Sequence, residues 1–213
     1  GTPLTHNEPP FVFVENHHVA GLDPDDPIRM ISHADVLKRG LEDWGWGRSE
    51  GAHRAHMTRP QDRIDLMLAD KAVQLIRQKN DQPLFLYLAF LAPHVPIAPA
   101  EEFQGTSQAG AYGDFVQQLD ASVGKVLDAL QDEGLSDNTL VIFTSDNGGV
   151  LHLDALNAGH RANGSLLGQK TDAWEAGHRV PFIARWPSQI PAGSKGNQLI
   201  GLTDLMATLA AAA

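Results

Sequence analysis

The sequence has no cysteine among its 213 residues, so the chain itself forms no disulfide, no thiolate metal site and no cysteine nucleophile. It also has no apolar run of about 18 residues or more, so we expect no membrane span. Basic residues are scarce: 16 lysines and arginines stand against 26 aspartates and glutamates, and they form no cluster. The resulting net charge of −10 argues against a nucleic-acid partner.

The length of the chain is that of one sizeable α/β domain or of a large piece of one. It opens on Gly1 without an initiator methionine, and it closes on a helical pattern without a cap, so we interpret both ends as cuts through a longer protein. Residues 1–60 are rich in Pro, Gly, Asp and His and are predicted to be an irregular, loop-rich region with one short strand at 11–15. Residues 61–213 are predicted to be the α/β part of the same single domain.

Hydrophobic periodicity predicts a strand–helix–strand unit. Apolar residues recur at helical spacing over 62–79 and over 112–130, and Gly134 stands where a C′ glycine ends a helix. Continuous apolar runs predict three buried strands, 84–92, 140–144 and 180–186. Because the first two of these strands flank a helix, we expect them to be parallel and joined by a right-handed crossover.

The strand at 140–144 ends in Asp146-Asn147-Gly148-Gly149, and this stretch has two interpretations. Asn-Gly is a common turn former that needs positive φ. A carboxylate beside an amide also presents oxygen ligands that suit Ca²⁺ or Mg²⁺. Two ligands are too few for a whole site, so further carboxylates would have to come from elsewhere.

His94 follows the strand at 84–92, between Pro93 and Pro96. The carboxyl ends of parallel strands lie along one edge of a sheet, where open α/β folds bind ligands. The strand order therefore predicts that His94 shares an edge with the Asp-Asn pair, although His94 taken alone is equally a turn histidine fixed by its prolines.

Lys170 lies in a glycine-containing excursion, just before a short helix that we expect to begin near Thr171 or Asp172, with one of them as N-cap. Its ammonium would suit an anionic oxyester, but a solvated surface lysine is the alternative. His160 could face a substrate, and the tryptophans could line a carbohydrate site, but neither is assigned a role in the site. The candidates without an assigned role are His17, His18, His53, His56, His160, His178, Arg179, Trp44, Trp46 and Trp174.

Five segments carry a family resemblance: PLFLYLAFLAPHVP, YGDFVQQLDASVGKVLDAL, NTLVIFTSDNGG, NGSLLGQKTDAWEAGHRVPFIARWPSQIPAG and LTDLMATLAA. In this order and at about this spacing they resemble the type I, arylsulfatase-like sulfatases of the alkaline-phosphatase superfamily. The resemblance covers residues 83–213, and it is looser over 1–60.

The resemblance implies an alkaline-phosphatase-like α/β/α sandwich with a mostly parallel central sheet, of which this chain would be a partial domain. It implies a sulfuric ester hydrolase acting on a sulfated carbohydrate or aryl sulfate. Asp146 and Asn147 would bind a divalent cation, usually Ca²⁺ and less often Mg²⁺, while His94 and Lys170 would contact the sulfate. A periplasmic or secreted location is expected from the resemblance alone.

The sequence departs from the family pattern in several places. It lacks the Cys/Ser-x-Pro-x-Arg motif that yields the formylglycine nucleophile, and also the paired aspartates and the Lys-x-His pair of the family's N-terminal part. Formylglycine is therefore expected upstream, and this chain alone is predicted to be inactive. Leu167 stands where relatives commonly have Arg, and Ala176 where they often have Gly. The alternatives are a phosphonate or phosphodiester hydrolase of the same superfamily, or a catalytically incompetent binding fragment.

Overall fold

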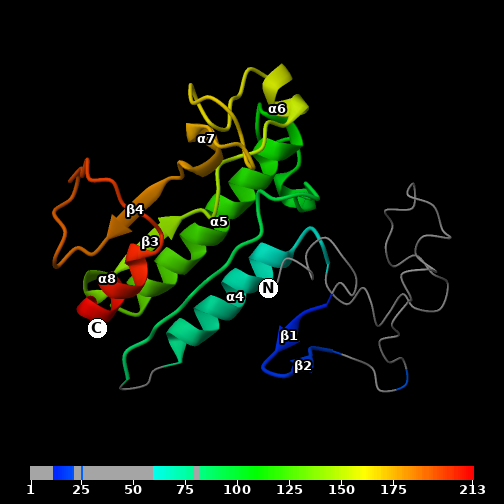
Figure 1. Ribbon diagram of the computed structural model, residues 1–213. Coiled ribbons are helices and arrows are strands. Elements are labelled where there is room, and N and C mark those ends of the chain that lie inside the picture. Colours follow the sequence, from blue (N-terminus) through cyan, green and yellow to red (C-terminus); the bar gives the residue numbers. More distant parts are fainter. Residues whose placement is uncertain (1–11, 22–24, 26–59, 79–81) are drawn as a thin grey trace.

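The computed structural model describes residues 12–21, 25, 60–78 and 82–213, so most of the predicted loop-rich region 1–60 lies outside the described residues. The helices are α4 (Ile64–Arg77), α5 (Gly110–Asp132), α6 (Leu153–Asn157), α7 (Glu175–His178) and α8 (Asp204–Ala212), with 3₁₀ turns η1 (Glu101–Phe103) and η2 (Ser136–Asn138). The strands are β1 (Val14–Glu15), β2 (His18–Val19), β3 (Val141–Thr144) and β4 (Phe182–Arg185) (Figure 1). None of the helices in this described part is long and apolar enough to cross a membrane.

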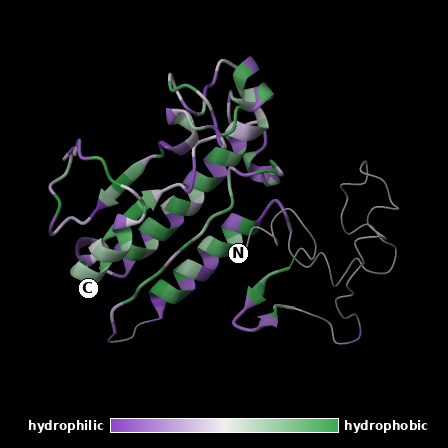
Figure 2. Ribbon diagram, viewed as in Figure 1, coloured by the Kyte–Doolittle hydropathy of each residue, from purple (hydrophilic) through white to green (hydrophobic). Residues whose placement is uncertain are grey.

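Helices α4 and α5 are the two predicted amphipathic helices, and their facing sides form the core. Polar and apolar residues alternate along both (Figure 2). Their apolar stripes meet at Val73, Ile76, Ala129 and Leu130, against which β3 packs through Val141. The predicted glycine cap is confirmed: Gly134 has φ +69°, and the next amide, of Leu135, donates to the carbonyl of Leu130 at 2.8 Å.

The predicted strands at 140–144 and 180–186 are confirmed as β3 and β4, whereas residues 84–92, which were predicted to run parallel to 140–144, form no strand. β3 pairs with β4 in an antiparallel register, Val141 opposite Arg185 and Thr144 opposite Phe182, and β1 pairs with β2 in the same sense. Both sheets of the described residues are two-stranded, so these residues do not form a mostly parallel sheet.

Residues 84–92 belong to neither of these sheets (Figure 1). An apolar run becomes a strand only where a neighbouring backbone supplies its ladder hydrogen bonds. β3 and β4 pair with each other, and 84–92 is left with Phe85 and Tyr87 exposed by 74% and 84%. The run was predicted to be covered on both faces, and here it is not.

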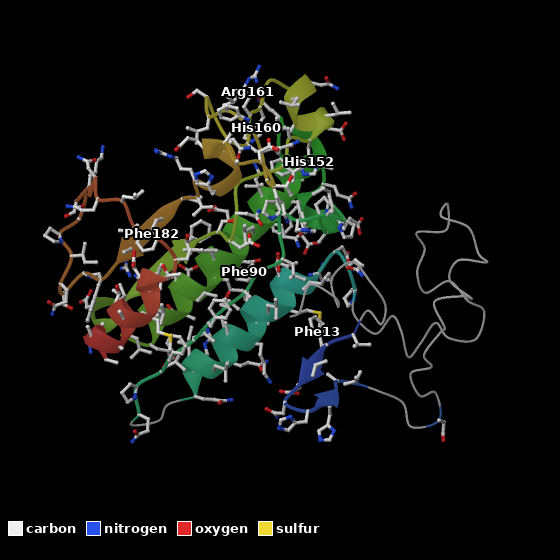
Figure 3. The ribbon with its side chains drawn as sticks, viewed as in Figure 1. Phe13, Phe90, His152, His160, Arg161 and Phe182 are labelled. Atoms are coloured by element: carbon white, nitrogen blue, oxygen red, sulfur yellow. The ribbon has the colours of Figure 1, made fainter. Side chains whose placement is uncertain are left out.

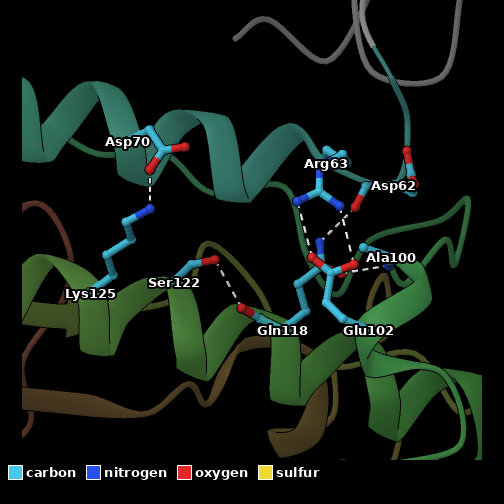
Figure 4. Close-up of polar contacts among 8 residues, drawn as sticks. All are labelled: Asp62, Arg63, Asp70, Ala100, Glu102, Gln118, Ser122 and Lys125. Carbon is cyan, nitrogen blue, oxygen red and sulfur yellow. Dashed lines mark hydrogen bonds and ion pairs between the residues drawn. The ribbon is translucent and has the colours of Figure 1, made fainter.

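Gln118 joins three segments of the chain at the interface of α4 and α5 (Figure 4). Its side chain is fully buried; Nε2 donates to the carbonyl of Asp62 at 2.8 Å and Oε1 accepts the amide of Ala100 at 2.7 Å. Ser122 donates its hydroxyl to the Gln118 carbonyl at 2.9 Å. The surface ion pairs Arg63–Glu102 and Asp70–Lys125 border this contact, but exposed pairs of this kind contribute little free energy.

We expect Gln118→Ala to lower the free energy of unfolding by about 2–4 kcal/mol, because the Ala100 amide and the Asp62 carbonyl lose their buried partner. Gln131→Ala, at an exposed position near the end of the same helix, should change it by less than about 0.5 kcal/mol. Urea denaturation of the two variants measures the difference. Equal effects would show that Gln118 does not hold the three segments together.

Candidate functional site

The Asp146-Asn147 pair lies directly after β3, as predicted, with Asp146 exposed and Asn147 half-buried. Asn147 donates its side-chain amide to the carbonyl of Gly148 at 3.0 Å, and the hydroxyl of Ser145 donates to the carbonyl of Asn147 at 3.1 Å. Because the Asn147 NH₂ group is used in this way, its side-chain oxygen is the atom that can face a cation beside the Asp146 carboxylate.

Gly148 is required by close packing rather than by positive φ. Neither Gly148 nor Gly149 has a left-handed φ, so the expectation of a positive-φ turn is wrong at both positions. A Cβ at Gly148 would instead lie 1.6 Å from the carbonyl oxygen of Ala176. The residue at 176 makes this approach with its backbone, so the alanine found there in place of the family's frequent glycine leaves the contact intact.

The segment 163–177 packs against this turn through four hydrogen bonds. The amide of Gly148 donates to the carbonyl of Gly177 at 3.1 Å, and the amide of Lys170 donates to the carbonyl of Gly149 at 3.1 Å. Asn163 accepts the Gly149 amide and donates to the Gly149 carbonyl, both at 2.9 Å. The structure therefore brings the backbone of the Lys170 segment to the Asp146-Asn147 turn.

The local structure around Lys170 differs from the prediction. Helix α7 begins at Glu175, not near Thr171 or Asp172. Asp172 does not cap it; its carboxylate accepts the amide of Gln169 at 2.9 Å, and Thr171 has φ +78°. The carboxylate therefore closes a tight turn around Lys170, whose side chain is half-buried.

His94 is held from a different element. Its amide donates to the carbonyl of Leu91 at 2.9 Å, and its ring Nδ1 donates to the carbonyl of Val95 at 2.7 Å. The turn is anchored on α4 by Asp65, whose carboxylate accepts the amides of Leu91 at 2.8 Å and Ala92 at 2.7 Å. His94 and Asp146 were predicted to lie along one sheet edge because the strands before them would be parallel. Residues 84–92 form no strand, so parallel strands do not place these two residues.

Asp65 and Asn163 hold the backbone beside candidate site residues, and the sequence interpretation did not single them out. Asp65 is 1% exposed, and burial raises the pKa of its carboxyl, while the Leu91 and Ala92 amides act in the opposite direction. It lies on the apolar stripe of α4 with Ala69, Ala72 and Ile76. A charged residue at such a position is the feature of the sequence that could have marked Asp65 as a buried carboxylate with hydrogen-bond partners. Asn163 precedes Gly164 in what reads as an ordinary turn, so no comparable signal marks it.

The remaining candidates are spread over other parts of the fold. The rings of His152 and His160 pack on Tyr112, with centroids 4.8 and 5.9 Å from its ring. Both histidines are labelled in Figure 3. His17 precedes β2 and His18 begins it, and both are exposed. Trp174 is exposed, and Arg179 pairs with Glu175 at 2.6 Å. Within the described ranges no three or more His, Asp or Glu side chains gather as a metal cluster. Four candidates lie outside the described residues: His53, His56, Trp44 and Trp46.

A family model described as Sulfatase matches residues 33–213. The chain belongs to the sulfatase family. This sulfatase chain is 35% identical to the N-acetylgalactosamine-6-O-sulfatase of Bacteroides thetaiotaomicron, over 98% of its own length and 46% of that relative's. It is 44% identical to the N-acetylgalactosamine-6-sulfatase of Canis lupus familiaris, over 97% of its own length and 38% of that relative's. It therefore spans less than half the length of these sulfatases.

Solved structures share the fold of this sulfatase chain. One, from a study of the metabolism of multiple glycosaminoglycans by Bacteroides thetaiotaomicron, matches with a TM-score of 0.70 and 32% identity over 84% of this chain and 43% of that one. Another, Ps i-CgsB in complex with k-i-k-neocarrahexaose, matches with a TM-score of 0.65 and 28% identity over 84% of this chain and 42% of that one. The predicted fold class, alkaline-phosphatase-like α/β and partial, is confirmed.

The close approach at Gly148 gives a direct test of how the sulfatase turn is packed. Gly148→Ala should lower the free energy of unfolding by about 2 kcal/mol or more, because the added methyl overlaps the Ala176 carbonyl. The control, Gly124→Ala in the middle of α5, has open space around its Cβ and should raise stability by about 0.5–1 kcal/mol. Urea denaturation distinguishes them, and a Gly148→Ala variant as stable as the parent would refute the packing.

Proposed function

We propose that this chain is the central to C-terminal part of the catalytic domain of a sulfatase that hydrolyses sulfate esters of carbohydrates. One observation carries the proposal: the Asp146-Asn147 turn and the Lys170 segment form a single hydrogen-bonded unit through Gly149. The backbone that carries the two hard-cation ligands is thereby held against the backbone of the residue that carries the ammonium group. The names of the relatives, and a neighbour solved with a carrageenan oligosaccharide, support a sulfated glycan as substrate.

In this proposal Asp146 and Asn147 hold a divalent cation. Their donors fit one, since an exposed carboxylate and an amide oxygen on adjoining residues suit a hard ion. Calcium takes about six to eight oxygen ligands, so the other ligands come from outside this pair; Ca²⁺ is favoured and Mg²⁺ is the lesser candidate. When bound, the cation would neutralise charge on the sulfate and the nucleophile.

His94 and Lys170 act on the sulfate ester itself. The ammonium of Lys170 pairs with a sulfate oxygen and stabilises the charge that grows there during attack. Because Nδ1 of His94 donates to the Val95 carbonyl, the proton that can be exchanged with substrate is on Nε2. When the ring is protonated on both nitrogens, His94 gives the Nε2 proton to the ester oxygen as the alcohol leaves, and the neutral ring keeps its proton on Nδ1.

The nucleophile of the proposed reaction is formylglycine, contributed by residues outside this sequence, because the 213 residues contain no Cys/Ser-x-Pro-x-Arg motif. The chain by itself should therefore not turn over sulfate esters. The phosphonate or phosphodiester alternative is not favoured, since the relatives and neighbours reported above are sulfatases by name or by family.

The test uses the full-length protein that contains this chain, with N-acetylgalactosamine 6-sulfate and the matching 6-phosphate as substrates. We expect hydrolysis of the sulfate ester, its loss on chelation with EDTA and its recovery with Ca²⁺. Asp146→Asn should lower kcat/KM by on the order of 10²–10³-fold, because it removes the negative charge of the ligand pair while Asn147 remains an uncharged ligand. Asp120→Asn, an exposed aspartate on α5, is the matched control and should leave kcat/KM unchanged.

Faster turnover of the phosphate ester would refute the sulfatase assignment and return the phosphoester alternative. Turnover of neither ester would support a non-catalytic binding protein. Equal kcat/KM values for Asp146→Asn and Asp120→Asn would remove Asp146 from the proposed metal site.

A further inference from the structure

The loop that carries His94 is clamped at both ends by buried polar side chains. At its start, the carboxylate of Asp65 accepts the amides of Leu91 and Ala92. At its end, the side chain of Gln118 accepts the amide of Ala100. Both side chains come from helices, and both are almost completely buried, so an exposed histidine is carried by a loop with rigid ends.

The Asp65 clamp is the closer of the two to His94 and the more unusual. Its carboxylate is buried among the apolar residues of α4. Burial of a charged group there costs free energy unless the group is hydrogen-bonded. Each oxygen accepts one backbone amide at 2.7 or 2.8 Å, within the short range of charge-assisted bonds. The clamp fixes the two residues that precede Pro93 and His94.

Two further hydrogen bonds connect this clamp to the imidazole. The amide of His94 donates to the carbonyl of Leu91, the residue whose own amide Asp65 holds. The ring is then oriented by the bond from Nδ1 to the Val95 carbonyl. Asp65 therefore fixes the position of the backbone from which the His94 ring projects. The Val95 carbonyl fixes the tautomer: the neutral ring carries its proton on Nδ1 and its lone pair on Nε2.

We propose that Asp65 is a positioning residue for His94: its carboxylate fixes the Leu91-Ala92 backbone so that Nε2 of His94 faces the sulfate ester. The inference rests on the role of His94 in the proposed function. Asp65 itself touches no substrate, and it acts only through the orientation of the His94 turn.

Asp114 is a matched control within the same protein. It too is a buried aspartate in a helix, and its carboxylate accepts two backbone amides of a neighbouring turn, Gly105 at 2.9 Å and Ser107 at 2.8 Å. That turn carries no proposed site residue. Loss of either carboxylate should destabilise the fold in a similar way, so a purely structural role predicts similar behaviour for Asp65→Asn and Asp114→Asn.

The first measurement is the ¹⁵N spectrum of the imidazole rings in the labelled full-length protein at a pH where they are neutral, with His94→Gln used to assign the signal. We expect the parent and Asp114→Asn to show His94 as the Nδ1–H tautomer. Asp65→Asn should shift His94 towards a mixture of tautomers, because the turn that aims Nδ1 at the Val95 carbonyl loosens. If Asp65→Asn does not fold, Asp65→Ser, which keeps an uncharged acceptor, takes its place.

The second measurement is hydrolysis of N-acetylgalactosamine 6-sulfate by the same variants, corrected for the folded fraction. Asp65→Asn should lower kcat by about ten- to a hundredfold with a smaller change in KM, while Asp114→Asn should stay within about twofold of the parent. An unchanged His94 spectrum in Asp65→Asn, or an equal change in both variants, would overturn the inference. Absence of turnover in the parent would instead refute the proposed function, and the ring spectrum would still decide the role of Asp65.

Discussion

The site depends on the backbone contact between Gly148-Gly149 and the 163–177 segment. Asn163 accepts the amide of Gly149 and donates to its carbonyl, and Gly148 passes so close to the Ala176 carbonyl that no side chain fits between them. This contact fixes the end of β3, where the carboxylate of Asp146 and the amide of Asn147 project, and it brings Lys170 to the same turn. Without it the three residues would belong to two independent loops.

The proposed site residues fall into two groups, and each group is held in place by different contacts. Lys170 and the Asp-Asn pair are joined by backbone hydrogen bonds and by an uncharged amide, whereas the His94 turn is tied to α4 by a buried carboxylate. Gln118 then links the far end of the His94 loop to α5 and to the start of α4. An exposed histidine is thus carried by the packed helix pair that forms the core, which favours a precise location over mobility.

The sequence allowed α4, α5, β3 and β4 to be predicted because each has a strong local signal, the apolar period or a short apolar run. It did not allow the pairing of residues 84–92 to be predicted, because an apolar run carries no information about which backbone lies beside it. The sequence offers Thr171 or Asp172 as a helix cap, but the helix begins at Glu175 and the Asp172 carboxylate closes the Lys170 turn instead. Asp146, Asn147 and Lys170 are predicted site residues on the basis of motif alone, whereas the backbone contacts of Asp65 and Asn163 are visible only in the fold.

The most direct test of this account is the kcat/KM for a sulfate ester of Asn163→Ala in the full-length protein, measured beside Asn157→Ala, an exposed asparagine at the end of α6. Asn163 would touch neither metal nor substrate, yet the account predicts a fall of about tenfold or more, because Gly149 loses the side chain that holds it to the Lys170 segment. Asn157→Ala should behave as the parent. An Asn163→Ala variant with the parental kcat/KM would contradict the claim that this contact assembles the site.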